Sequence, residues 1–155
     1  MDAMQLLVSA ALSLVTGYIG GSLSESRRRR LERRTMLRAL SVEIGDIAET
    51  CDRTHFRMNS FVTDHSVGEP LPRSNLSSND WAIYSANISK LGLIHSFYIN
   101  SVVDFYTRCR SMVDEEIFIR DNEVIPERLA RHVEEWKVMS EYGRYINRGL
   151  GRVVN

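Results

Sequence analysis

The sequence predicts an all-α protein, in which a single N-terminal transmembrane helix continues into an antiparallel cytoplasmic bundle of three to four helices. Three observations support this fold class. No charged residue occurs in residues 3–24, an arginine cluster follows at once, and apolar residues then recur at alternating spacings of three and four. No segment shows the strict alternation of a β-strand between turn signals. The length of 155 residues suits one compact domain.

The predicted organisation has three parts. Residues 1–25 form the transmembrane helix. Residues 26–38 form an arginine-rich neck that begins a long helix. Residues 39–155 form the bundle, which includes a long loop at residues 63–79. The formal net charge of the whole chain is zero, although the neck carries an excess of arginines. The bundle must therefore carry an excess of acidic residues, so a basic neck lies beside an acidic bundle in the sequence.

Residues 3–24 are long enough to span a membrane. As a helix, this uncharged stretch measures about 33 Å, which matches the hydrocarbon core of a bilayer. A cleaved signal peptide is a weaker interpretation, because the start of the chain carries Asp2 and no basic residue. A buried soluble helix would need partner surfaces on every side, which a chain of this length hardly provides.

Small residues recur at every fourth position of the predicted span. They are Ser9, Ser13, Gly17 and Gly21, and a helix places them on one face. Small-xxx-small faces let helices approach closely in lipid, so we expect a homo-oligomer that associates through this face. In a higher oligomer, a polar stripe could instead line a lumen. That stripe consists of Gln5, Ser9, Ser13 and Thr16.

The arginine cluster follows the span directly and predicts its orientation. Arginines flank only the C-terminal side, so that side is expected in the cytoplasm and the N-terminus outside, in the inner membrane of a bacterium. The same side chains are predicted to contact anionic lipid headgroups. Nucleic acid is a weaker partner, because no aromatic residue is interleaved to stack on bases. The residues concerned are Arg27, Arg28, Arg29, Arg30, Arg33 and Arg34.

The long helix that begins in the neck is predicted to extend from Ser26 to about Val62. Its apolar positions form a seam typical of coiled-coil or bundle packing, with Thr54 or His55 filling one gap. The seam consists of Leu37, Leu40, Ile44, Ile47, Cys51, Met58 and Val62. Prolines and cap residues then predict a loop, from which Ser77, Ser78 or Asn79 can cap the next helix.

Three further helices are predicted. A short one covers Trp81–Leu91, before a bend at Gly92, and a longer one covers about Ile94–Arg120. Pro126 is well placed as the first residue of the last helix. The tail from Gly149 onward is expected to fray.

The two cysteines, Cys51 and Cys109, fall on apolar helical faces and lack a CxxC partner. We expect small core residues in a reducing compartment, and a disulfide between helices is the alternative.

No catalytic, metal or cofactor signature is present. The four histidines lack the paired ExxH motifs of a metal-binding bundle, and there is no Walker, GxGxxG, GxSxG or HExxH sequence. We therefore expect no cofactor and no catalytic or metal site. An enzyme with an unrecognised site remains an alternative, and its candidate residues are Asp52, His55 and His132.

The expected function is that of a non-enzymatic, membrane-anchored bundle that self-associates and binds an unidentified cytoplasmic protein. The layout of one span, a basic neck and a small bundle also resembles the small membrane partners of some anti-phage defence systems. Those proteins oligomerise and permeabilise the membrane. The resemblance is one of architecture, without a matching motif, and it implies a pore-forming or membrane-perturbing effector as the alternative.

Overall fold

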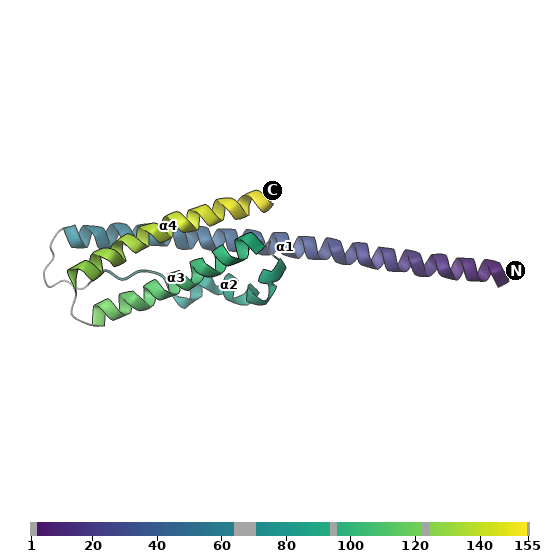
Figure 1. The fold of residues 1–155 in the computed structure, drawn as a ribbon, viewed down its shortest axis with the longest axis horizontal. Helices are drawn as coiled ribbons and strands as arrows, with labels where there is room; N and C mark the ends of the chain where they lie inside the picture. Colours follow the sequence, from purple (N-terminus) through teal and green to yellow (C-terminus); the bar gives the residue numbers. More distant parts are fainter. Residues whose placement is uncertain (1–2, 64–70, 94–95, 122–124, 155) are drawn as a thin grey trace. The chain divides into compact units, whose positions relative to one another are not determined.

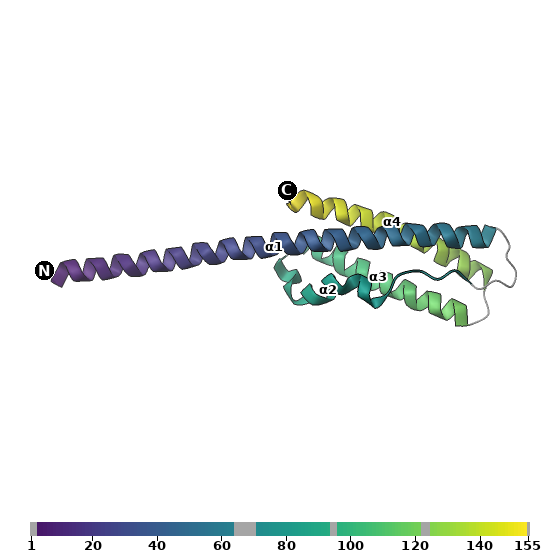
Figure 2. The same cartoon turned by 180° about the vertical axis from the view of Figure 1, so that it is seen from behind.

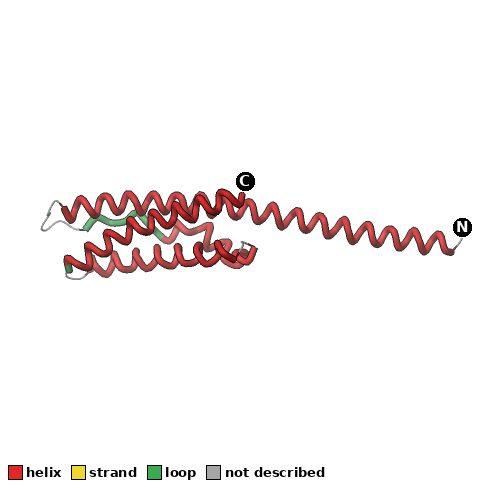
Figure 3. The backbone as a smooth tube through the Cα atoms, turned by 45° about the horizontal axis from the view of Figure 1, so that its top comes forward, coloured by secondary structure: helices red, strands yellow, loops and turns green. Residues whose placement is uncertain are grey.

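A computed structural model describes residues 3–63, 71–93, 96–121 and 125–154 of the chain. Side chains are described from residue 24 onward within these ranges, apart from residues 78, 79, 93, 96, 97 and 154. The described residues form helices and connecting segments without a strand, which confirms the all-helical prediction (Figure 3). The elements are α1 (Ala3–Thr63), the 3₁₀ helix η1 (Ser78–Trp81), α2 (Ala82–Asn87), the 3₁₀ helix η2 (Ile88–Leu93), α3 (Ser96–Asp121) and α4 (Pro126–Val154).

The chain divides into two compact units, Met1–Thr35 and Met36–Asn155, and α1 contributes to both. The first unit is helical from Ala3 onward. Within the described part of the chain, no helix combines the length and the apolar character needed to cross a bilayer. The transmembrane helix that the sequence predicts for residues 1–25 gains no support from this result.

The second unit is a helical bundle, in which α3 and α4 both pack along residues 36–63 of α1. The chain direction can be followed by colour in Figures 1 and 2. Helix α4 runs opposite to α1 and to α3, whereas α1 and α3 run in the same direction. This is possible because residues 71–93 return the chain along the bundle between the end of α1 and the start of α3. The predicted antiparallel arrangement is therefore wrong for α1 and α3.

The predicted seam of α1 forms one side of the core. From Leu37 to Met58, its apolar members are at most 2% exposed, and Thr54 fills the gap at 1%. The prediction is wrong at Val62, which is 38% exposed. That position lies one residue before the end of α1.

Helix α4 is longer than the sequence predicted. It continues to Val154, so the expected fraying from Gly149 is wrong. Burial explains the difference: Leu150 is fully buried, and a Cβ at Gly149 would lie 2.7 Å from Cε1 of Tyr98. These contacts hold the last turns against the bundle.

The short helix predicted at Trp81–Leu91 is in fact three short elements, η1, α2 and η2. The backbone of Trp81, at φ −115° and ψ 32°, interrupts the α-helical geometry. The backbone N–H groups of Ile83 and Tyr84 donate to the carboxylate of Glu43 on α1, at 2.6 and 3.0 Å. A contact with another helix therefore fixes where α2 begins.

Helices α1 and α4 approach closely at two glycines. A Cβ at Gly143 would lie 2.8 Å from both Cβ of Ala48 and Cε2 of Phe105. A Cβ at Gly45 would lie 2.8 Å from Nδ2 of Asn147, whose Oδ1 accepts a hydrogen bond from the Ser41 hydroxyl. The absence of a side chain at these two positions lets the helices pack at short distance.

Candidate functional site

The arginine cluster predicted to bind lipid headgroups lies in the first unit, on α1. Arg28 and Arg29 are 70% and 68% exposed, and both pair with Glu25, at 3.7 and 2.9 Å. Arg28 also lies 3.5 Å from Glu32.

The remaining arginines of the cluster carry the excess charge. Within the described residues, Arg27, Arg30 and Arg34 make no ion pair with an acidic side chain, and all three are exposed. Successive residues of an α-helix are about 100° apart, so residues 27–30 point in nearly all directions around the helix. The cluster is therefore a belt of positive charge and not a single basic face.

The predicted oligomerisation face lies outside the residues whose side chains are described. This face consists of Ser9, Ser13, Gly17 and Gly21. The possible polar lumen also lies outside the described side chains, and its residues are Gln5, Ser9, Ser13 and Thr16. The backbone of all these residues is helical, in α1.

Among the described residues of the second unit, two glutamates and one histidine are buried: Glu43, Glu116 and His132. The sequence analysis selected only His132, as a candidate for an unrecognised catalytic site. Glu43 is the most fully bonded of the three. Besides the two N–H groups of α2, its carboxylate accepts the Tyr106 hydroxyl at 2.5 Å. Burial, followed by the hydrogen bond to Glu43, raises the pKa of Tyr106. The ring of Tyr106 stacks on that of Tyr84, with centroids 4.0 Å apart.

Glu116 on α3 holds the segment before η1. Its Oε1 accepts the backbone N–H of Ser74 at 2.9 Å and lies 4.0 Å from the Arg120 guanidinium. Glu43 and Glu116 thus bind two parts of the same returning segment, residues 71–93. Both carboxylates accept hydrogen bonds from backbone N–H groups of that segment, so they hold the segment against the bundle.

His132 is 1% exposed on α4. Its Nε2 accepts the indole N–H of Trp136 at 3.0 Å, so the neutral ring carries its proton on Nδ1. Nδ1 is buried and has no hydrogen-bond partner among the described residues. Burial lowers the pKa of His132, and the carboxylates of Glu116, Glu135 and Glu115 act in the opposite direction.

A groove of about 650 Å³ lies between α3 and α4, with His132 in its wall. The Arg128 guanidinium donates to both carboxylate oxygens of Glu115, at 2.5 and 2.9 Å, and lowers the pKa of that carboxyl. Arg108, Arg131, Glu127 and Glu135 also line the groove. Its arginines and glutamates are equal in number, so the groove has no net charge that would select a cation or an anion.

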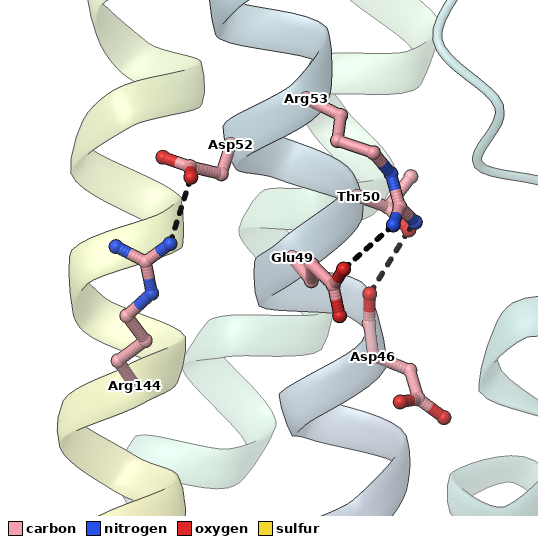
Figure 4. A network of polar contacts seen from close by, with 6 residues as sticks. All are labelled: Asp46, Glu49, Thr50, Asp52, Arg53 and Arg144. Atoms are coloured by element: carbon pink, nitrogen blue, oxygen red, sulfur yellow. Dashed lines mark hydrogen bonds and ion pairs between the residues drawn. The ribbon is translucent and has the colours of Figure 1, made fainter.

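The residues considered for an unrecognised catalytic site are not assembled into one. Asp52 pairs with Arg144 at 2.8 Å (Figure 4). It also accepts the Ser140 hydroxyl at 3.5 Å. Ser140 lies eight residues beyond His132 on α4, which is about 12 Å along the helix. Asp52 and His132 therefore lie at different levels of the bundle. His55 is half-buried, and no contact joins it to either of them in the described part of the chain.

Figure 4 also shows the contacts of the next residue, which points away from Asp52. Arg53 donates to Glu49 at 2.8 Å and to the Thr50 hydroxyl at 3.0 Å, both on the preceding turn of α1. These are exposed contacts between helix neighbours, of the kind that stabilise a helix surface by a few tenths of a kcal/mol. Across the described residues, no three His, Cys, Asp or Glu side chains come together in a way that could hold a metal ion.

Comparison with known proteins finds no protein-family model, no curated protein and no solved structure that matches this chain.

Proposed function

We propose that this chain is a non-enzymatic, membrane-anchored interaction protein that self-associates through its N-terminal helix and presents the helical bundle to a cytoplasmic partner. The anchor rests on the sequence: residues 3–24 contain no charged side chain, and their backbone from Ala3 onward is helical. A helix of this length suits the hydrocarbon core of a bilayer.

The observation that carries the proposal is the belt of arginines immediately after this uncharged helix. Arg27, Arg30 and Arg34 are exposed and unpaired among the described residues, so their charge is available to a binding partner. Acidic headgroups surround a helix that emerges from a bilayer, and a belt can contact them on all sides. Each arginine near such a surface contributes roughly 1 kcal/mol. The basic flank also favours a cytoplasmic bundle with the N-terminus outside.

Self-association is proposed through Ser9, Ser13, Gly17 and Gly21. In lipid, close backbone packing drives helix association, and these small residues allow it. Replacing Gly17 and Gly21 together by leucine should reduce the oligomeric mass of the full-length protein in a mild detergent. The matched change places two leucines at Ala11 and Ser22, on the other side of the helix, and should leave the mass unchanged. Equal masses for both variants would contradict association through the small-residue face.

Membrane anchoring has a direct test in the full-length chain. Leu14→Arg places a charge in the middle of residues 3–24, which costs about 2.5–3.5 kcal/mol in a spanning helix. Leu31→Arg adds the same charge within the arginine belt, at a side chain that is already 65% exposed. We expect only Leu14→Arg to move the protein from the membrane fraction to the alkaline carbonate extract. A wild-type chain that is itself extracted by carbonate would refute the anchor.

A pore-forming effector would use the same helix differently, with Gln5, Ser9, Ser13 and Thr16 lining a lumen. This second function is favoured by the polar stripe in the sequence. Its test is dye release from vesicles of anionic phospholipid that contain the purified protein. Release that Gln5→Leu abolishes would replace the interaction role by a pore, whereas tight vesicles would exclude the pore.

A further inference from the structure

Two cysteine thiols from different helices meet in the core of the bundle. Cys51 on α1 and Cys109 on α3 are both fully buried, and both belong to the same hydrophobic cluster. Neither is part of a disulfide. Cys51 is also the main cause that raises the pKa of the Cys109 thiol, as expected for two side chains that interact.

The register of the helices places these residues together independently. Cβ of Ala48 and Cε2 of Phe105 both lie 2.8 Å from the Cβ position of Gly143, so Ala48 and Phe105 are at the same level of the bundle. Helices α1 and α3 run in the same direction (Figures 1 and 2). Cys51 follows Ala48 by three residues and Cys109 follows Phe105 by four, so each cysteine lies one turn further on the same inward face.

We propose that Cys51 and Cys109 form an intramolecular disulfide that links α1 to α3 when the protein meets a disulfide oxidant such as glutathione disulfide. This modification goes beyond the proposed membrane role and does not depend on it. Without such an oxidant the two residues remain free core thiols.

The reaction is a double thiol–disulfide exchange. One cysteine loses its proton to solvent, and its thiolate attacks a sulfur of glutathione disulfide. The sulfur–sulfur bond of the oxidant breaks, and one glutathione thiolate leaves. The second cysteine then loses its proton, and its thiolate attacks the protein sulfur of the mixed disulfide, so that the second glutathione leaves. The two electrons lost by the cysteines are those gained by the two glutathione molecules.

Burial determines when this exchange can occur. Interaction with Cys51, followed by burial, raises the pKa of Cys109, and only a thiolate is an effective nucleophile. The closed bundle therefore protects both thiols, and the reaction proceeds through openings that expose them. Mild destabilisation should accelerate oxidation severalfold and should yield the same product.

The test uses the full-length protein in a mild detergent, incubated with glutathione disulfide with and without sub-denaturing urea, and then alkylated. Intact mass should show the loss of two hydrogens, and peptide mapping should find Cys51 joined to Cys109. The urea midpoint should rise, and dithiothreitol should reverse the rise. Cys51→Ala and Cys109→Ala are matched controls, and each should stop at a single glutathione adduct without a cross-link.

Several results would overturn the proposal. Glutathione adducts that persist on both cysteines of the wild-type chain would show that the sulfurs cannot reach one another. Disulfide-linked dimers would show that the partner thiol belongs to another molecule. Thiols that remain unmodified in sub-denaturing urea, or a cross-link that lowers the urea midpoint, would show that the native packing does not accommodate the bond.

Discussion

Helices α1 and α4 approach each other closely at Gly143. We therefore predict that even one added methyl group at this position lowers the free energy of unfolding. In Gly143→Ala, the new Cβ would lie 2.8 Å from a carbon of Ala48 and from a carbon of Phe105, whereas unstrained carbon atoms lie about 3.5–4.0 Å apart. The Cβ of Ala48 cannot rotate away, so the helices must separate or the aromatic ring must shift. Overpacking of this kind costs about 1–3 kcal/mol.

Gly151 on the same helix provides the matched control, because nothing lies within 4 Å of its Cβ position. Alanine is favoured over glycine in a helix by up to about 1 kcal/mol, and this gain is common to both variants. We therefore expect Gly151→Ala to be at least as stable as the wild type. Gly143→Ala should be less stable than Gly151→Ala by about 1–3 kcal/mol, which is the overpacking cost alone.

The assay is urea unfolding of the full-length protein in a mild detergent, followed by tryptophan fluorescence. Trp136 is fully buried in the core and reports on the bundle. Gly45→Ala should fall between the two variants, because its new Cβ meets the end of the Asn147 side chain, which can rotate about its own bonds, and not a fixed carbon atom. If Gly143→Ala is as stable as Gly151→Ala, the two helices do not approach closely at Gly143 and the reasoning is refuted.

Three further predictions concern single side chains. Burial lowers the pKa of His132 below the usual 6.5, so the unfolded chain binds its proton more tightly. The free energy of unfolding should fall as the pH drops from 6.5 towards the lowered pKa. In urea titrations at several pH values, the free energy of unfolding of His132→Gln should fall less steeply than that of the wild type. Tyr106→Phe removes a hydrogen bond to the buried Glu43 carboxylate and should lower the free energy of unfolding by about 1.5–3 kcal/mol. Phe56 is 72% exposed, so Phe56→Ser should change that free energy by less than about 0.5 kcal/mol.

Apolar spacing was sufficient to predict the three long helices and the α1 side of the core, but not the short elements η1, α2 and η2. The residues of the α1 seam up to Met58 are buried, and the last helix buries Leu129, Val133, Trp136 and Ile146, which also recur at spacings of three, four and ten. This succeeds because the side of a helix that faces the core must be apolar over several turns, which leaves a period of about 3.6 residues in the sequence.

The buried polar side chains could not be predicted in the same way. Glu43 lies between Leu40 and Ile47 at helical spacing, beside the seam, and this position was the only signal that it turns inward. Its burial depends on N–H donors some forty residues further along the chain. Spacing within one helix carries no information about such donors. It likewise gave no reason to expect that Glu116 and His132 are buried.

The start of α2 shows how a tertiary contact can replace a local cap. At η1, the contact is local, because the Asp80 carboxylate accepts the backbone N–H of Ser77 at 2.5 Å. At α2, the N-cap residue Trp81 makes no side-chain cap hydrogen bond. Glu43 supplies the missing acceptor from α1, and its negative charge also suits the positive end of a helix.

If Glu43 is this cap, removing its side chain should lower the free energy of unfolding far more than removing a glutamate side chain on the surface of the same helix. Glu43→Ala leaves two backbone donors and one phenol without their acceptor, and we expect a loss of about 3 kcal/mol in the free energy of unfolding. Glu49→Ala removes only an exposed pair with Arg53, so a change of less than about 0.5 kcal/mol is expected. Hydrogen exchange at the Ile83 and Tyr84 amides should accelerate in the first variant alone. Equal stability of the two variants, with both amides still protected, would show that α2 begins without help from α1.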